Sequence, residues 1–237
     1  MSTIVLSAGG TGGHLFPAQA LAAELLRRGR KIVVMTDARG RSYEAAFPGV
    51  KIETVPSASP ANTNIAGQVL APIEIFRGVF VALTKLLRLK PAAVVGFGGY
   101  PSLPVMIAAW LAGFPTAIHE QNAVLGRVNR LIAGKMRAIA ASFPFARFAP
   151  KDAQRVSYTG NPVRLEAVAL AHSPYEAPGP SGEIRLLVFG GSQGARVLSD
   201  LVPAAIALLP VTLIAGCQTW MLGSYPAIPF AFIRMSF

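Results

Sequence analysis

The chain has 237 residues, 52% of them hydrophobic, but no stretch supplies the roughly 20 unbroken apolar residues of a membrane-spanning helix. Its formal net charge is +11 and it has one cysteine, which excludes an internal disulfide and agrees with a reducing compartment. No nucleic-acid-binding motif accompanies the charge and no signal peptide opens the chain, so we expect a cytoplasmic protein that meets phosphorylated substrates or an anionic membrane surface, and no nucleic acid.

The first recognisable unit is a glycine-rich stretch, Ser7–His14, between the apolar run Ile4–Leu6 and the amphipathic run Pro17–Arg28. This order predicts a strand, a tight loop and a helix. Glycines allow a ligand to approach the backbone, and unpaired N–H groups at the helix start attract an anion. We therefore expect a phosphate or pyrophosphate site with His14 at its edge, although a generic tight turn with a locally bonded histidine is the alternative.

The usual nucleotide-binding signatures are not met in this loop. The G-x-G-x-x-G frame that starts at Gly10 has Leu15 where the last glycine belongs, and no Gly-Lys-[Ser/Thr] sequence of a P-loop follows. Asp37 ends the second apolar run, where a ribose-binding acid lies in nicotinamide enzymes, so an oxidoreductase is a minor alternative. No His-Glu-x-x-His motif or Cys/His cluster occurs, and we expect neither a metal nor a cofactor.

Short apolar runs alternate with helical runs along the next part of the chain. The predicted strands are Lys31–Asp37, Lys51–Val55, Ala92–Gly96 and Thr116–Glu120, and the predicted helices are Arg41–Phe47, Ile65–Leu89, Ser102–Ala112 and Val124–Ala133. This alternation predicts a doubly wound α/β domain with a parallel sheet. Ligands of such sheets bind at the carboxyl ends of the strands, where the opening loop, a second glycine loop (Gly96–Pro101) and His119–Asn122 are expected to converge.

The long helical run is richer in apolar residues than one buried helix face requires, and cations flank them. This pattern is typical of helices that lie on an anionic membrane surface, although ordinary core packing is the alternative. The candidate membrane-docking residues are Ile73, Ile75, Phe76, Phe80, Arg77, Lys85 and Arg88.

The chain divides into four parts by composition. Residues 1–173 hold the first α/β domain, residues 174–183 form a Pro/Gly-rich linker, and residues 184–216 begin a second domain with a strand (Ile184–Phe189), a glycine loop and a helix from about Arg196 to Leu209. Residues 217–237 are apolar and broken by prolines without a helical period, and we assign them no structure.

Five motifs, in order along the chain, are Gly9–His14, Gly96–Tyr100, His119–Asn122, Gly160–Arg164 and Gly190–Ala195. Together they resemble the MurG family of N-acetylglucosaminyltransferases of bacterial peptidoglycan synthesis, and the resemblance covers roughly residues 1–215. It implies a GT-B fold of two Rossmann-like domains at the cytoplasmic face of the plasma membrane. The implied reaction is inverting transfer of GlcNAc from UDP-GlcNAc to the MurNAc C4 hydroxyl of undecaprenyl-pyrophosphoryl-MurNAc-pentapeptide (lipid I), which gives lipid II.

The resemblance also implies roles for individual residues. His14 is the candidate general base, and Arg164 with the amides around Ser192 offsets the charge of the departing UDP without a metal. The residues implied for the acceptor pyrophosphate are Gly9, Gly10, Gly98, Gly99 and Tyr100. Those implied for the donor are Thr11, Gly12, Gly13, Asn122, Arg164 and Ser192.

The C-terminal part departs from the family. The family's second domain continues beyond the length of this chain, and residues 217–237 do not resemble it, which a frameshifted or prematurely ended reading would explain. We therefore expect this polypeptide alone to bind the donor poorly and to turn over little. The alternative is a non-catalytic module that binds lipid I at the membrane and requires a separate donor-binding chain.

Overall fold

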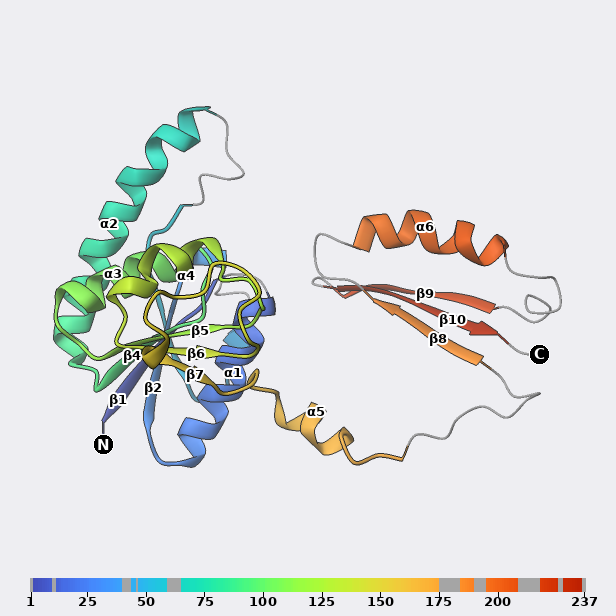
Figure 1. The fold of residues 1–237 in the computed structure, drawn as a ribbon, viewed down its shortest axis with the longest axis horizontal. Coiled ribbons are helices and arrows are strands. Elements are labelled where there is room, and N and C mark those ends of the chain that lie inside the picture. Colours follow the sequence, from blue (N-terminus) through green and yellow to red (C-terminus); the bar gives the residue numbers. More distant parts are fainter. Residues whose placement is uncertain are drawn as a thin grey trace. The chain divides into compact units, whose positions relative to one another are not determined.

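The computed structural model describes residues 2–9, 12–39, 44–45, 47–58, 65–174, 184–189, 195–208, 218–225 and 228–235. The chain forms two compact units, Met1–Ala171 and His172–Phe237, which are described separately (Figure 1).

The first unit is built on a seven-stranded parallel sheet with the strand order β3-β2-β1-β4-β5-β6-β7. The strands are β1 (Thr3–Ser7), β2 (Lys31–Thr36), β3 (Lys51–Thr54), β4 (Ala93–Gly96), β5 (Thr116–Glu120), β6 (Ala138–Ala141) and β7 (Val156–Tyr158). The parallel α/β architecture predicted from the sequence is confirmed. The order reverses between β1 and β4, where Ser7 pairs with Gly96, so both glycine loops leave the sheet side by side.

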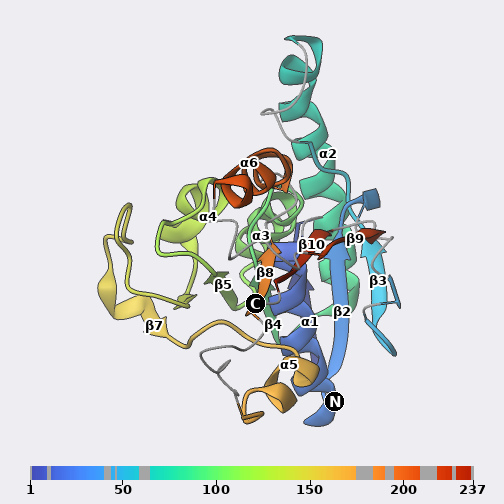
Figure 2. The same ribbon diagram turned by 90° about the vertical axis from the view of Figure 1, so that its right-hand side faces the viewer.

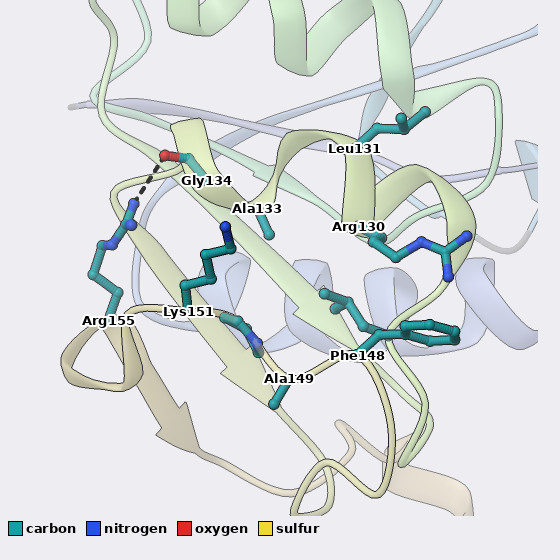
Figure 3. A pocket seen from close by; sticks show the side chains of 10 residues that line it. Arg130, Leu131, Ala133, Gly134, Phe148, Ala149, Lys151 and Arg155 are labelled. Carbon is teal, nitrogen blue, oxygen red and sulfur yellow. Dashed lines mark hydrogen bonds between the residues drawn. The ribbon is translucent and has the colours of Figure 1, made fainter.

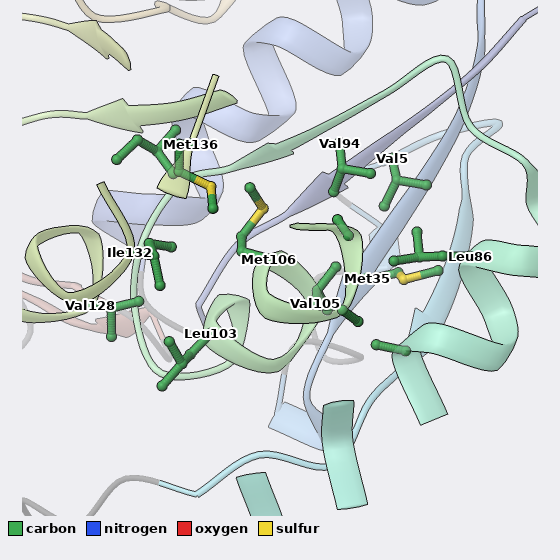
Figure 4. Close-up of a cluster of buried hydrophobic side chains, with 14 of the residues drawn as sticks. Val5, Met35, Leu86, Val94, Leu103, Val105, Met106, Val128, Ile132 and Met136 are labelled. Atoms are coloured by element: carbon green, nitrogen blue, oxygen red, sulfur yellow. The ribbon is translucent and has the colours of Figure 1, made fainter. Parts of the chain in front are cut away.

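Successive side chains of a strand point to opposite faces of the sheet. Both faces carry apolar side chains, and helices cover both of them. Val5 belongs to a core formed with α2 and α3 (Figure 4). The adjacent Leu6 belongs to a second core, formed with α1. The helices of the unit are α1 (Gly12–Arg27), α2 (Ile65–Leu89), α3 (Ser102–Leu111), α4 (Arg127–Ile132) and α5 (Leu165–Leu170).

Helix α1 begins at Gly12, five residues before the predicted start at Pro17. Glycine has poor helix propensity, so the sequence pattern shows the helix only where apolar residues recur. The correction matters for the site, because His14 lies in the first helical turn and not in a loop.

Other boundaries also differ from the prediction. Helix α4 starts at Arg127 and not at Val124, because Val124 forms an isolated bridge with Arg147. Strands β6 and β7 and helix α5 have no counterpart among the predicted elements. The predicted helix Arg41–Phe47 falls mainly outside the described residues, and Phe47 at its end is buried in the core with α1.

Helix α2 has 25 residues, and its first turns extend beyond the sheet in both ribbon views (Figures 1 and 2). Pro72 lies inside this helix. Within the described part of the chain, no helix is both long enough and apolar enough to cross a bilayer.

The second unit contains β8 (Ile184–Phe189), α6 (Ala195–Ala207), β9 (Gln218–Tyr225) and β10 (Ile228–Met235), and α6 lies over one face of the sheet β8-β10-β9 (Figure 1). The predicted strand and helix are confirmed. Residues 217–237, to which the sequence pattern assigns no structure, contribute two strands, and Pro229 sits at the register shift where a ladder tolerates proline. The pairing is antiparallel, which differs from the parallel pairing implied for a Rossmann-like unit.

Candidate functional site

The two glycine loops touch each other at the carboxyl ends of β1 and β4. The N–H of Gly9 donates to the carbonyl of Gly98 over 3.1 Å. Gly98 and Gly99 have φ angles of +89° and +76°, and a Cβ added to Gly99 would lie 3.0 Å from the Cα of Gly9. Both the left-handed backbone and the close approach therefore require glycine here.

The imidazole of His14 covers this contact and joins it to the third segment. A Cβ added to Gly99 would lie 3.2 Å from Cδ2 of His14. On its other side, Nδ1 of His14 lies 3.1 Å from Oε1 of Gln121, which follows β5. The structure thus brings together the three segments that the sequence pattern places at one crevice.

A cleft of about 280 Å³ opens at this junction. It is lined by His14, Gly98, Gly99, Tyr100, Glu120, Asn122, Gly126, Arg127, Val128 and Asn129. The lining combines glycine backbone with the start of α4, so an anionic ligand would meet both the glycine backbone and the positive charge of Arg127.

His119 is buried directly behind the cleft. Its Nε2 lies 3.1 Å from the carbonyl of Gly160, and its Nδ1 lies 3.1 Å from Nε2 of Gln121. Burial lowers the pKa of His119 below its ordinary value, although the Gly160 carbonyl and the Glu120 carboxylate act in the opposite direction. His119 is therefore neutral near pH 7.

Glu120 organises the loop that follows β5. One carboxylate oxygen accepts from the backbone N–H and the side-chain amide of Asn122, and the other accepts from the Gly126 N–H and the Asn129 amide. Only 1% of Glu120 is exposed, so these four bonds replace the water that its charge would otherwise need. The carboxylate fixes the loop between β5 and α4, which contributes Asn122 and Gly126 to the lining of the cleft.

The predicted acceptor residues Gly98, Gly99 and Tyr100 line the cleft together with His14. The Gly9 N–H is already used by the Gly98 carbonyl, so Gly9 contributes close backbone packing and not a free amide. Gly10 lies outside the described residues.

Among the predicted donor residues, Asn122 lines the cleft and Gly12 and Gly13 form the first residues of α1. Thr11 and Ser192 belong to the parts of the chain that the structure does not describe. Arg164 is exposed, and its guanidinium lies over the ring of Phe16 on α1.

The site also contains Arg127 and Asn129, which lie outside the predicted motifs, and Gln121, which lies within the predicted segment His119–Asn122 but has no predicted role. Gln121 directly follows His119 and Glu120 at the end of a predicted strand. This position at the carboxyl end of the sheet is the sequence feature that points to a role in the site. Arg127 and Asn129 enter through the start of α4, which the prediction places three residues too early.

The exposed face of α2 carries large apolar side chains. Ile73, Phe76 and Phe80 are 55%, 73% and 64% exposed, whereas Ile75 is partly buried against the core. Arg88 is also exposed on this helix.

The cations of α2 differ in their partners. Arg77 pairs with Glu74 on the helix surface over 2.6 Å, and the Arg77 side chain is largely in solvent whereas the Glu74 side chain is partly buried. Lys85 is partly buried and pairs with Glu53 of β3. The exposed surface therefore contains fewer residues than the predicted membrane-docking set, because Ile75 packs inward and Lys85 pairs with the Glu53 carboxylate.

A larger cavity of about 630 Å³ lies between α4 and the segment that precedes β7 (Figure 3). Arg130, Lys151 and Arg155 line it, and the Arg130 guanidinium lies 4.3 Å from the centroid of the Phe148 ring. Arg155 donates to the carbonyls of Gly134 and Met136, so its guanidinium already has protein partners. None of the sequence-predicted site residues lines this cavity, and size alone does not make it the functional site.

Asp37, the residue behind the oxidoreductase alternative, is buried and accepts from Nε of Arg39 over 2.7 Å. It is not among the residues that line the cleft beside His14. Among the described residues, no group of three or more metal-ligating side chains occurs.

Comparison with known proteins identifies the family. Residues 4–141 match the model of the glycosyltransferase family 28 N-terminal domain. A protein of Rhodospirillum centenum, named UDP-N-acetylglucosamine–N-acetylmuramyl-(pentapeptide) pyrophosphoryl-undecaprenol N-acetylglucosamine transferase, is 49% identical over 211 residues, which are 89% of this chain and 55% of that protein. A protein of the same name from Methylorubrum extorquens is 49% identical over 208 residues, covering 87% of this chain and 56% of that protein.

Solved structures agree with this match. MurG of Acinetobacter baumannii superposes with a TM-score of 0.64 and 27% identity over 88% of this chain and 58% of that one. The kitacinnamycin glycotransferase, with a TM-score of 0.54 and 15% identity over 76% of this chain and 55% of that one, shares the fold. The chain spans a little over half the length of the curated relatives that it matches.

Proposed function

The chain belongs to glycosyltransferase family 28 through its N-terminal domain, and we propose that it takes part in the enzymatic transfer of GlcNAc from UDP-GlcNAc to the MurNAc C4 hydroxyl of lipid I. The product is lipid II, the disaccharide precursor of peptidoglycan. The observation that carries the proposal is the cleft in which His14 meets two glycine turns at the carboxyl ends of β1 and β4. The names of the relatives, which specify this donor and this lipid-linked acceptor, support it.

The acceptor pyrophosphate binds where backbone amides and a cation surround the cleft. Gly98 and Gly99 have positive φ angles and no side chains, so an anion can approach their backbone closely. The N-terminus of α1, where His14 lies in the first turn, adds the positive end of the helix dipole. Arg127, which also lines the cleft, supplies a full positive charge.

The reaction is a single displacement at the anomeric carbon. Nε2 of His14 takes the proton of the MurNAc C4 hydroxyl while the C4 oxygen forms a bond to C1 of GlcNAc. The bond from C1 to the UDP oxygen breaks and its electron pair leaves with UDP, so the anomeric configuration inverts. Arg164, with Thr11, Gly12, Gly13, Asn122 and Ser192 as further donor contacts, offsets the charge that develops on UDP.

The chain docks peripherally on the cytoplasmic leaflet, where lipid I presents its head group. The docking surface consists of Ile73, Phe76, Phe80, Arg77 and Arg88 of α2. Its apolar side chains enter the acyl boundary and its cations face anionic lipid heads. The exposure of three large apolar side chains on one helix supports this surface.

The test separates acceptor binding from transfer. The purified chain is titrated with a short-chain lipid I analogue, and UDP-[14C]GlcNAc is then added to measure labelled lipid II. We expect the analogue to bind more tightly than the same lipid without its MurNAc-pentapeptide. We expect only slow transfer by the chain alone, and we expect His14→Ala to abolish that transfer while binding persists. Equal binding of both lipids, without any transfer, would overturn the proposal.

A further inference from the structure

We propose that Gln121 is a positioning residue that holds His14 in the tautomer with a proton on Nδ1, so that Nε2 presents its lone pair to the cleft. The catalytic consequence rests on the proposed function, but the tautomer itself can be observed without any activity. The inference comes from a chain of hydrogen bonds that is anchored at backbone carbonyls, which can only accept.

The first fixed point is the carbonyl of Phe97. The amide end of Gln121 assigned as Nε2 lies 3.1 Å from this oxygen, and 3.2 Å from the carbonyl oxygen of His119. Because both are acceptors, the end of the side chain that faces them must be the NH2 group and not the oxygen. The orientation of the Gln121 amide is therefore determined by its surroundings.

The second fixed point is the carbonyl of Gly160, which lies 3.1 Å from Nε2 of His119. Since this carbonyl accepts, Nε2 of His119 carries a proton, and in the neutral ring Nδ1 then has a lone pair. That lone pair faces the Gln121 NH2 group at 3.1 Å, which agrees with the orientation set by Phe97. The lowered pKa of His119 supports the neutral ring.

With the NH2 group directed to Phe97 and His119, Oε1 of Gln121 faces His14. The distance from Oε1 to Nδ1 of His14 is 3.1 Å, and an amide oxygen offers only lone pairs. Nδ1 of His14 must therefore carry the proton. In the part of the chain that the structure describes, Nε2 of His14 has no hydrogen-bond partner, and the ring lines the cleft.

This arrangement prepares His14 for the step assigned to it. A neutral histidine with its proton on Nε2 would place two acceptors against each other at Gln121 and would leave no lone pair for the sugar hydroxyl. In the observed arrangement, Nδ1 keeps its bond to Oε1 both before and after Nε2 takes the C4 proton. Gln121 touches neither substrate in this scheme and acts through His14.

None of the other ionisable groups around His14 is hydrogen-bonded to its ring within the described part of the chain. Tyr100, Glu120 and Arg127 line the same cleft, and His119 lies on the far side of Gln121. Both oxygens of Glu120 already accept hydrogen bonds from the loop after β5. Replacing Gln121 with a glutamate would place a carboxylate directly against Nδ1 of His14.

The first test is a long-range 1H–15N NMR spectrum of the full chain with labelled histidine at pH 8. The chain has only three histidines, so His14→Ala and His119→Gln assign the signals. We expect the Nδ1–H pattern for His14 and the Nε2–H pattern for His119. An Nε2–H pattern for His14, or an average of both tautomers, would overturn the inference whether or not the chain transfers GlcNAc.

The second test compares Gln121→Met, Gln121→Glu and the control Gln154→Glu on the exposed segment before β7. Gln121→Met removes the acceptor at similar size, and the His14 signals should become a tautomer average. In Gln121→Glu the acid limb of the pH profile of kcat should move to higher pH, because an adjacent opposite charge favours the charged ring. Gln154→Glu should leave this limb and the His14 tautomer unchanged.

A purely structural role for Gln121 predicts a different result. It would lower the melting temperature in both Gln121 variants without changing the His14 tautomer or the pH profile of kcat. That outcome would overturn the inference while leaving the proposed transferase reaction intact. If the parent chain neither transfers GlcNAc nor prefers the lipid I analogue but the tautomers are as expected, the proposed function fails and the tautomer assignment stands.

Discussion

The guanidinium of Arg164 lies 4.5 Å from the centroid of the Phe16 ring on α1. The segment that follows β7 is thereby attached to the helix that begins at the glycine loop. Gly12 belongs to the same stack, because a Cβ added to it would lie 2.9 Å from Cε2 of Phe16. The aromatic ring thus holds a cation in a defined place beside the start of α1.

We predict that Phe16→Leu weakens UDP binding about two- to fivefold, because an exposed cation–π contact contributes roughly 0.5–1 kcal/mol. Calorimetric titration with UDP measures the change, and Arg164→Lys should lose at least as much, since an ammonium does not reproduce the stacking of a guanidinium. Phe143→Leu, at an exposed phenylalanine outside the stack, is the matched control and should bind UDP as the parent chain does. Unchanged UDP binding in Phe16→Leu would remove Arg164 from the donor site.

The contact between the glycine loops gives a second prediction. Gly99→Ala should destabilise the chain and distort the cleft, because alanine in the left-handed region costs roughly 1–2 kcal/mol and its Cβ would also meet the Cα of Gly9. Gly113→Ala is the matched control, since Gly113 has a φ of +74° but open space around its Cβ position. Chemical denaturation measures both variants, and equal losses of stability would show that the approach of the two loops is unimportant.

The docking surface on α2 predicts a specific loss of membrane binding. Phe76→Asp and Phe80→Asp should each weaken binding to anionic vesicles about tenfold or more, because burial of a phenylalanine contributes roughly 1.5–3 kcal/mol. Their unfolding free energies should change by less than about 0.5 kcal/mol, because both side chains are exposed. Vesicle flotation tests this, with Leu208→Asp as the control at an 86% exposed position of the second unit. Unchanged flotation would mean that α2 does not meet the membrane.

Burial of His119 predicts how stability depends on pH. Its pKa in the folded chain is lowered from 6.5, so below that pH the unfolded chain binds more protons than the folded one. The stability that neutral His119 contributes is complete above about pH 6.5 and is lost as the pH falls from there through the folded pKa. Glu24 and Glu53 also have lowered pKa values, but their contributions are lost only below their ordinary value of 4.5.

Melting temperatures measured from pH 8 to pH 5 test this expectation. His119→Gln should be less stable at pH 8, because Gly160 and Gln121 lose a partner, and its stability should change less between pH 6.5 and 5. His172→Gln, at an exposed position, should keep the parent profile. A parent chain as stable at pH 5 as at pH 8 would contradict the neutral, buried state of His119.

Much of the first unit could be predicted because local patterns decide it. Apolar runs bounded by glycine or proline define β1, β2, β4 and β5, and their alternation with helices requires parallel pairing. Strand β6 escaped prediction because its sequence Ala138–Ala141 has little preference for strands, and β7 has only three residues. Long-range sheet pairing supplies what these segments lack locally.

The site was predictable to the level of segments but not of side chains. The sequence indicates that His14 and Gln121 lie at the same edge of the sheet, but their hydrogen bond joins residues 107 positions apart. Local sequence also cannot show that the Gly9 amide is used by Gly98, or that Lys85 is held by Glu53. Each of these facts depends on which partner tertiary packing brings within reach.

The strand order leaves β3 and β7 at the edges of the sheet, which affects the solubility of the first unit. An open sheet has two edges, and unpaired edge strands invite pairing with other chains and aggregation. Here one edge is β3, whose Lys51 and Glu53 form an ion pair 2.7 Å long, and the other is the three-residue β7. A charged edge and a very short one both discourage strand addition, so the first unit is protected against edge-to-edge self-association.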